Sequence, residues 1–198
     1  MNQWGVIWIN VIIAVVSGLL NKLELDSNKY SIFLSRDVDL KMAEFSRIIL
    51  VAFLSLVISI ILGLILIVIS LFLPTPSLTS LSRILLTVLL IWVTTLWQIP
   101  FTLWLSRKTN LYFSMIINTI APLIIGTSFS LLDNWYIFPY DWSLKLLEPM
   151  TKMKINGIPF GTEYVPDYSM IYISLFLGVI LFIILSEISA ISFKKQVK

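Results

Sequence analysis

Five long runs of apolar residues divide this chain, and they restrict its fold more than any other feature. The runs are Trp4–Leu20, Ile48–Phe72, Ile84–Leu105, Leu111–Leu132 and Met170–Ile191. A helix needs about 20 mostly apolar residues to cross a bilayer. The composition agrees, because 58% of the 198 residues are hydrophobic and 13% are charged, against about 25% charged in soluble domains. The sequence predicts an all-α, polytopic transmembrane helix bundle of five spans that forms a single domain over residues 1–198.

The first apolar run invites comparison with a cleaved signal peptide. Signal peptides begin with basic residues and end at a cleavage site flanked by small ones. No Lys or Arg precedes Lys22, and the run ends without a convincing small-x-small site. We therefore interpret Trp4–Leu20 as a span that stays in the mature protein.

The connections between the apolar runs alternate between the two sides of the membrane, and Lys and Arg are divided unequally between these sides. The side that holds residues 21–47, residues 106–110 and the C-terminal tail carries ten of them, whereas the other side carries four, set against five acidic residues. Connections rich in Lys and Arg stay in the cytoplasm. We therefore expect a multi-pass protein of the bacterial cytoplasmic membrane, with residues 133–168 extracellular, the C-terminus cytoplasmic and the N-terminus outside.

The residue types that are missing restrict the chemistry. The chain has no Cys and no His, which removes the thiolate nucleophile, the commonest general base and the commonest metal ligands. It has no GxxxxGK[ST] phosphate loop and no GxSxG motif. An intramembrane aspartyl protease needs two facing carboxylates, and we identify only one acid near a span interior, Glu187. We expect no enzymatic activity, no catalytic residue, no cofactor, no metal and no nucleic-acid partner.

We single out five polar or helix-bending residues within the predicted spans. We interpret Gln98 and Asn118 as hydrogen-bond partners between helices rather than as a substrate site. Glu187 lies about one turn from the cytoplasmic end of its span, where we expect it to pair with a Lys or Arg of a neighbouring element; a proton or substrate relay is the weaker alternative. Pro100 and Pro122 each remove a backbone hydrogen bond and predict kinks in the third and fourth spans.

Residues 21–47, the polar segment, hold ten charged residues between the first two spans. Tyr30, Phe33 and Leu34 have the i, i+3, i+4 spacing of one helix face. This spacing predicts a short amphipathic helix at the membrane interface, with Ser27 as its N-terminal cap. Docking to a soluble partner and a solvated hairpin without a partner remain equally open from the residues alone.

A second helix is predicted at the end of the polar segment. Asp39 can cap a helix over Leu40–Arg47, because its side chain can accept a hydrogen bond from a free backbone N–H. That helix leads directly into the long second span. The predicted order is therefore span, interfacial helix, capped helix and span.

Residues 133–168 are unusually aromatic for a connection. Leu144, Leu147 and Met150 form an apolar stripe on a predicted short helix, with Lys145 facing away. Trp and Tyr favour positions where one end of the side chain is apolar and the other is wet. An interfacial lid is the simpler interpretation and a contact surface for a peptide is the alternative. The aromatic residues are Trp135, Tyr136, Phe138, Tyr140, Trp142, Phe160, Tyr164 and Tyr168.

Two parts of the chain resemble one family of transporters. The polar segment, which ends in a capped helix with a basic residue, resembles the coupling segment of ABC-2-type exporter permeases. Residues 135–160 are similar to the late extracellular segment of the lantibiotic-immunity permeases within that family. That similarity rests on the aromatic–Pro stretch Trp135–Pro139, the apolar piece Leu144–Leu147, Pro149, and the turn Asn156-Gly157-Ile158-Pro159.

The resemblance implies a function and its partners. This chain would be one of two paralogous membrane subunits of an ABC exporter that expels an antimicrobial peptide from the membrane and so gives self-immunity. Its partners would be a separate ATP-binding subunit, a second permease copy or paralogue, the lipid bilayer and an amphipathic peptide. The alternative is a non-transport membrane protein, an immunity or regulatory factor that binds its ligand without ATP.

The resemblance also implies where the contacts lie. The ATPase-coupling residues would be Tyr30, Phe33, Leu34, Arg36, Asp37 and Asp39. The extracellular peptide or lipid contact would be made by Trp135, Tyr136, Trp142, Leu144, Leu147, Asn156, Gly157 and Pro159.

The chain departs from the family in two respects. The family usually begins with a cytoplasmic amphipathic piece and a sixth span, and we expect the DNA upstream of Met1 to encode such a stretch. The family also commonly has a Pro near the position of Asp37, which this chain lacks.

Overall fold

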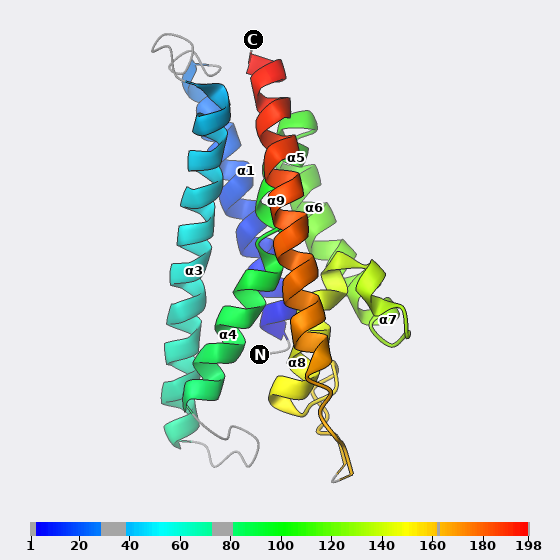
Figure 1. Cartoon of the computed structure of the whole chain (residues 1–198). Helices are drawn as coiled ribbons and strands as arrows, with labels where there is room; N and C mark the ends of the chain where they lie inside the picture. Colours follow the sequence, from blue (N-terminus) through cyan, green and yellow to red (C-terminus); the bar gives the residue numbers. More distant parts are fainter. Residues whose placement is uncertain (1–2, 29–38, 73–80, 162, 198) are drawn as a thin grey trace.

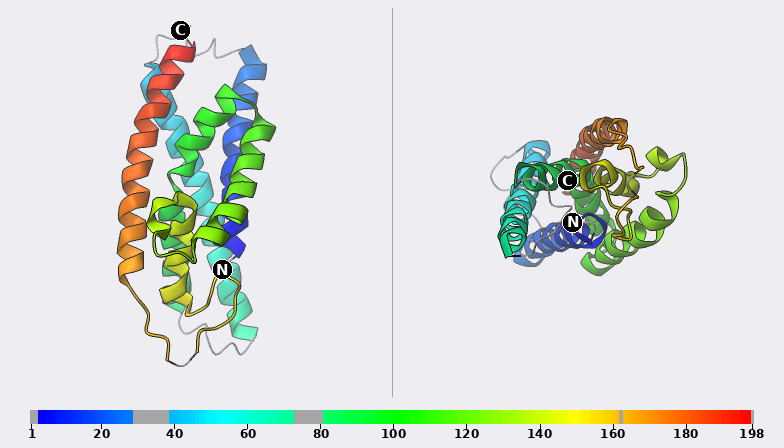
Figure 2. Two further views of the ribbon diagram at one scale, coloured as in Figure 1. Left: turned by 90° about the vertical axis from the view of Figure 1, so that its right-hand side faces the viewer. Right: turned by 90° about the horizontal axis from the view of Figure 1, so that it is seen from below.

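The computed structural model describes residues 3–28, 39–72, 81–161 and 163–197. The described residues form helices joined by turns and contain no β-strand, apart from an isolated bridge between Met153 and Pro159. The helices run up and down side by side and pack around a common core (Figure 1; Figure 2). This confirms the all-helical class, and the arrangement is compatible with a helical membrane bundle.

The elements follow one another with few interruptions. Their bounds are η1 (Trp4–Trp8), α1 (Ile9–Asn28), α3 (Leu40–Phe72), α4 (Leu81–Thr95), α5 (Gln98–Lys108), α6 (Leu111–Ala121), η2 (Pro122–Gly126), α7 (Thr127–Phe129), η3 (Trp135–Ile137), η4 (Pro139–Asp141), α8 (Trp142–Thr151) and α9 (Ser169–Val197). Here η1 and η2 are π-helical, and η3 and η4 are 3-10 helices.

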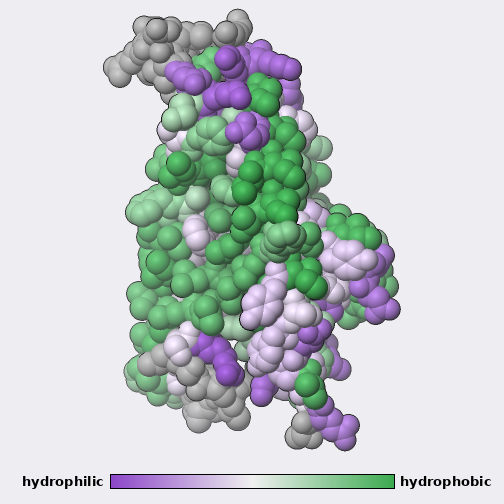
Figure 3. All heavy atoms as spheres, viewed as in Figure 1, coloured by the Kyte–Doolittle hydropathy of each residue, from purple (hydrophilic) through white to green (hydrophobic). Residues whose placement is uncertain are grey.

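Four helical stretches within the described residues are long and apolar enough to cross a membrane. They are Trp4–Asp26, Leu40–Phe72, Leu111–Phe129 and Ser169–Gln196, and the pair α4 and α5 supplies a fifth if its two helices are taken as one span. The space-filling view shows hydrophobic residues across the middle of the molecule and hydrophilic ones toward both ends (Figure 3). Long apolar helices with this banding indicate a membrane-embedded protein.

Successive long helices run in opposite directions, so the connections between them lie at the two ends of the bundle. At one end, which we call the charged end, lie the end of α1, the start of α3, the end of α5 and the C-terminal turns of α9 (Figure 1). At the other, which we call the aromatic end, lie the start of α1 and residues 133–161 and 163–168, including α8. Within the described residues, the helix ends therefore gather at two ends of the bundle.

Asp39 begins α3 as predicted. Its Oδ1 atom accepts a hydrogen bond from the backbone N–H of Lys41 at 2.9 Å. The helix then continues without a break to Phe72, so the capped helix and the second span are one element of 33 residues. Ser27 does not begin a new helix, because α1 runs on through it to Asn28. Residues 21–28 contain no Gly or Pro to stop the helix, and charged pairs described below hold this part of α1 against α3.

The third predicted span is broken rather than continuous. Helices α4 and α5 meet at a bend of 41° at Leu96 and Trp97. Pro100 has no N–H to donate to the carbonyl of Leu96, and its ring crowds that carbonyl; the N–H of Ile99 bonds to Leu96 instead, at 3.0 Å. Pro122 begins the π-helical segment η2. Both prolines thus distort the helices that contain them, as predicted.

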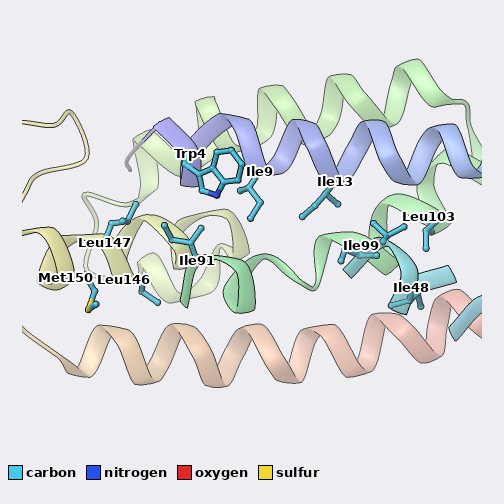
Figure 4. Close-up of a cluster of buried hydrophobic side chains, with 11 residues drawn as sticks. Trp4, Ile9, Ile13, Ile48, Ile91, Ile99, Leu103, Leu146, Leu147 and Met150 are labelled. Atoms are coloured by element: carbon cyan, nitrogen blue, oxygen red, sulfur yellow. The ribbon is translucent and has the colours of Figure 1, made fainter. Parts of the chain in front are cut away.

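The apolar core fills the space between the helices. Ile9, Ile13, Ile91, Ile99 and Leu103 are almost fully buried there (Figure 4). Small residues let two pairs of helices approach closely. On α3, Ser55, Ser59 and Gly63 recur every four residues and are buried, and Gly63 lies against Leu85 of α4. On α9, a Cβ at Gly178 would come within 3.2 Å of the Cα atom of Thr94. Small residues at such spacing are typical of helix packing in membranes.

Helix α8 is enclosed in the bundle rather than laid along the interface. It packs against α4, α9 and η1, and Leu144, Leu146 and Leu147 are at most 2% exposed. Lys145 does not face away as expected, because its Nζ atom pairs with Glu148 at 3.2 Å and both side chains are largely buried. The stripe that suggested an interfacial helix instead closes the aromatic end of the core.

Candidate functional site

A buried carboxylate, Glu44 of α3, is the centre of a charged cluster at the charged end. Its side chain is fully buried. One oxygen, Oε1, accepts from the guanidinium of Arg107 of α5 and from the hydroxyl of Ser189 of α9, both at 2.5 Å. The other oxygen accepts from Arg47, one turn along α3, at 2.6 Å. Glu44 therefore joins three helices by charge-assisted hydrogen bonds.

Arg47 extends the cluster to α1. Its Nη2 atom lies 3.0 Å from a carboxylate oxygen of Glu24 and donates to the side-chain oxygen of Asn21. The amide nitrogen of Asn21 donates to the backbone carbonyl of Leu103 at 2.9 Å and to the hydroxyl of Ser106, both on α5. Helices α1, α3, α5 and α9 are thus fastened to one another by polar side chains within a few turns of the charged end.

An aromatic ring lies beside both guanidinium groups. Phe193 of α9 is fully buried, and its ring centroid lies 5.0 Å from the guanidinium carbon of Arg47 and 5.1 Å from that of Arg107. Cations within about 6 Å of a ring face are attracted to it. The Nε2 atom of Gln196, one turn further along α9, donates to the backbone carbonyl of Arg107 at 3.3 Å. The end of α9 is therefore part of the cluster.

The charges of the cluster compensate one another. Two carboxylates, Glu24 and Glu44, face two guanidinium groups, Arg47 and Arg107. Buried charges are costly unless they are paired and hydrogen-bonded, and here each carboxylate has at least one guanidinium within 3.0 Å. Such an arrangement fixes the relative positions of four helices. Among the residues that the structure describes, no three His, Cys, Asp or Glu side chains could hold a metal ion.

Glu44 corrects the expectation that Glu187 is the only acid near a span interior. We assigned residues 40–47 to a cytoplasmic helix outside the spans, so the burial of Glu44 was missed. The sequence contained a signal, because Glu44 and Arg47 are three residues apart in a helix that continues into an apolar run, and Arg107 directly follows another such run. Opposite charges at this spacing share a helix face.

Glu187 itself forms the kind of pair predicted for it. Its carboxylate lies 3.7 Å from the Nζ atom of Lys41, and the two side chains are 53% and 39% exposed. The pair joins α9 to the first turn of α3 at the surface. This geometry agrees with the interfacial ion pair rather than with a relay through the bundle.

Most of the predicted coupling residues lie outside the described residues. These are Tyr30, Phe33, Leu34, Arg36 and Asp37. Of that set the structure places Asp39, at the start of α3. Helices α1 and α3 lead to and from residues 29–38, and the cluster fastens both helices to the bundle.

Gln98 and Asn118 are buried polar residues of the two distorted spans. Asn118 donates to the Ser114 carbonyl of its own helix at 2.9 Å and faces the hydroxyl of Tyr140 at 3.5 Å. The Oε1 atom of Gln98 is buried without a hydrogen-bond partner among the described residues, as is the hydroxyl of Thr102 one turn along α5. Asn118 thus makes a contact to another element, whereas the contact predicted for Gln98 is not formed at this atom.

The aromatic end is built differently from the charged end. The indole ring of Trp97 lies 5.0 Å from the ring of Tyr140 and 6.4 Å from that of Trp142, both in edge-on contacts. Trp142 donates to the carbonyl of Tyr136 at 2.9 Å. Edge-on aromatic pairs add to the stabilisation that burial of the rings provides. Trp97 stands at the bend between α4 and α5, so the rings tie this bend to the connection that precedes α8.

Asp141 stands between Tyr140 and Trp142 in the chain, and its carboxylate has no hydrogen-bond partner among the described residues. The residue is fully buried. Burial raises the pKa of Asp141 to about 7, although the positive charge of Lys145 lowers it in part. Burial also raises the pKa of the neighbouring Tyr140 hydroxyl. The carboxyl of Asp141 therefore changes protonation near neutral pH in the folded protein.

The predicted extracellular contact residues are divided between the interior and the surface. Trp135, Trp142, Leu144 and Leu147 are buried and support the bundle. Tyr136, Asn156, Gly157 and Pro159 are exposed. The predicted turn is present, because the N–H of Gly157 bonds to the carbonyl of Lys154 at 2.8 Å and Gly157 has a φ of 83°, a left-handed conformation that favours glycine. Of the predicted contact residues, the second group is therefore the one that a ligand can reach from outside.

Comparison with known proteins yields no relative. No family model matches the chain, and no curated protein and no solved structure matches it.

Proposed function

We propose that this chain is the membrane subunit of an ABC exporter that expels an amphipathic antimicrobial peptide from the membrane, with ATP hydrolysis on a separate chain. The resemblance of the polar segment and of residues 135–160 to lantibiotic-immunity permeases motivates the proposal. The exporter would contain a second permease copy or a paralogue. The charged end would face the cytoplasm and the aromatic end the outside.

The charged cluster is the observation that supports this proposal best. A motor that acts from outside the membrane must push on an element that is joined firmly to the spans. Asn21 and Glu24 of α1 and Glu44 and Arg47 of α3 lie close to the two ends of residues 29–38, and Arg107 links them to α5. A force applied to residues 29–38 would therefore act on several helices together. A solvated hairpin without a partner would have no need of such fixed supports.

The aromatic end suits the proposed peptide substrate. Tyr136, Asn156 and Pro159 are exposed there beside the apolar band of the bundle. An amphipathic peptide held at the outer leaflet would present both apolar and polar groups to such a surface. The buried α8 would then close the bundle behind the peptide.

The decisive experiment tests Phe33 in the segment that receives the ATPase. Phe33→Asp would place a charge in an apolar docking contact, which costs several kcal/mol when the charge is desolvated. We expect this variant to insert normally, to lose co-purification of the separate ATPase subunit and to lose resistance of the cells to the peptide. Phe33→Leu is the matched control, because it keeps the apolar contact, and it should retain both.

The outcome separates transport from ligand binding without ATP. If Phe33→Asp retains the ATPase and the resistance, the mechanical role of the polar segment is wrong. If no ATPase co-purifies and cells without ATP remain protected, the chain is a binding protein of the alternative class.

Orientation is tested in the same cells, because the chain has no Cys of its own. We expect Asn156→Cys to react with a membrane-impermeant thiol reagent in intact cells. Lys194→Cys should react only after the membrane is opened. The reverse pattern would place the charged end outside and exclude docking of a cytoplasmic ATPase.

A further inference from the structure

A groove opens at the charged end between the last turns of α5 and α9. It has a volume of about 380 Å³ and is lined by Lys108, Ile188, Ile191, Ser192, Lys195 and Gln196. The α9 residues recur at intervals of three and four, so they form one face of that helix. The hydrogen bond from Gln196 to the backbone carbonyl of Arg107 holds the two helices together beside the groove. Two helices fixed by the charged cluster thus supply its walls.

The groove carries two positive charges that no carboxylate of the described residues neutralises. Neither Lys108 nor Lys195 forms an ion pair with a described residue, and no acid is among the lining residues. The acids nearest in the fold are engaged elsewhere, since Glu44 pairs with the two arginines and Glu187 with Lys41. The two ammonium groups come from different helices and face one space. An anion would be attracted to that space.

The opposite part of the groove is apolar. Ile188 and Ile191 are 48% and 41% exposed, and they follow the exposed apolar residues Ile180, Ile183 and Ile184 along α9. Ser192 and Gln196 lie at the same level as the lysines and can donate further hydrogen bonds. The groove therefore combines cationic and hydrogen-bonding groups at the end of the bundle with apolar groups toward its middle.

We propose that this groove binds an anionic phospholipid, with the phosphodiester between Lys108 and Lys195 and an acyl chain along Ile188 and Ile191. Basic pockets between transmembrane helices bind anionic headgroups in this way. A free phosphate would use the lysines but would leave both isoleucines without a role. Lysines at helix C-termini also interact with the helix dipole, but that interaction requires no groove shared by two helices. The inference goes beyond the proposed export function and does not depend on it.

The test measures lipid binding to the purified full-length chain by native mass spectrometry. Phosphatidylglycerol, phosphatidylcholine and inorganic phosphate are titrated separately. We expect the chain to hold one phosphatidylglycerol in preference to phosphatidylcholine. In K108Q/K195Q the affinity for phosphatidylglycerol should fall about thirtyfold, about fivefold for each lysine.

The control variant is K22Q/K194Q. It removes the same charge from the same end of the bundle, at two exposed lysines that do not line the groove. We expect it to bind phosphatidylglycerol as the unchanged chain does. All four substitutions are at exposed side chains, so folding is expected to be preserved, and circular dichroism verifies it.

A further variant distinguishes the lipid from a free anion. Ile191→Ser should weaken binding of phosphatidylglycerol while leaving binding of phosphate unchanged. The proposal is wrong if K108Q/K195Q binds like the control variant, if both lipids bind equally, or if phosphate binds as tightly as phosphatidylglycerol.

Discussion

The two ends of the bundle contain buried carboxylates in opposite situations. Glu44 at the charged end accepts hydrogen bonds from two guanidinium groups and a hydroxyl. Asp141 at the aromatic end, between Tyr140 and Trp142 in the chain, has no hydrogen-bond partner for its carboxylate among the described residues. Both residues are fully buried. Burial alone therefore does not decide what a carboxylate does in this protein; its partners do.

The contrast indicates different roles for the two ends. Glu44 is paired with two guanidinium groups, and its network joins four helices. Asp141 has its pKa raised to about 7 by burial, so it can gain or lose a proton near neutral pH.

The largest effect is expected for Glu44→Gln. The substitution leaves Arg47 and Arg107 buried with only Glu24 to compensate them, and breaking a buried ion pair costs about 3–5 kcal/mol. The apparent Tm of the purified protein in detergent should fall by roughly 10 °C. Tryptophan fluorescence during heating measures it.

The double variant E44L/R107L sharpens this prediction. It removes one carboxylate and one guanidinium together, so Glu24 and Arg47 still compensate each other. Its Tm should lie above that of Glu44→Gln, because replacing both partners by apolar groups is much less costly than removing one. A double variant less stable than the single one would show that the cluster is not held by charge compensation.

A smaller effect of opposite sign is expected for Asp141→Asn. The folded-state pKa of Asp141 is about 7, above the unfolded value near 3.9, so the folded protein binds the proton more tightly. Its stability should therefore be greatest below about pH 4, fall as the pH rises toward 7, and remain low above it. Three pKa units correspond to roughly 4 kcal/mol at most. Asp141→Asn should abolish this slope and raise the Tm at pH 8.

Asp167→Asn is the matched control for the pH series. Hydrogen bonds from Ser169 lower the pKa of Asp167, which lies at the surface. The stabilisation by Asp167 is therefore present above its unfolded pKa and is lost only as the pH falls through its lower folded value. Asp167→Asn should leave the slope between pH 5 and 8 unchanged. An equal loss of slope in both variants would refute the assignment to Asp141.

Much of the fold could be predicted because hydropathy and helix caps are local signals. The apolar runs located the long helices, Asp39 was identified as the cap of α3, and Pro100 predicted the disturbance of the third span. The pairing of Glu187 with a basic residue of a neighbouring element was predicted from its position near a helix end. Each of these depends on residues close together in the sequence.

The charged cluster could not be assembled in this way. Glu44 and Ser189 are 145 residues apart and Glu44 and Arg107 are 63 apart, so only the packing of α3, α5 and α9 brings them together. Local pattern also misled at α8. An apolar stripe suggested an interfacial helix, whereas contacts with α4, α9 and η1 enclose the helix on most sides and bury the pair Lys145 and Glu148 with it.

The smallest effect is expected for Glu187→Gln. This variant compares an exposed carboxylate of the charged end, Glu187, with the buried one, Glu44. The Glu187 carboxylate lies 3.7 Å from the Nζ atom of Lys41, farther apart than the 2.5–3.0 Å of the ion pairs in the buried cluster, and both side chains are partly exposed. Water and salt screen such a pair, and its contribution is about 0–1 kcal/mol. We expect Glu187→Gln to change the Tm by no more than about 3 °C, and the small difference to shrink further in 0.5 M NaCl. If the Tm falls as far as in Glu44→Gln, the surface pair stabilises the fold as strongly as the buried cluster does. The distinction between buried and exposed carboxylates at the charged end would then be wrong.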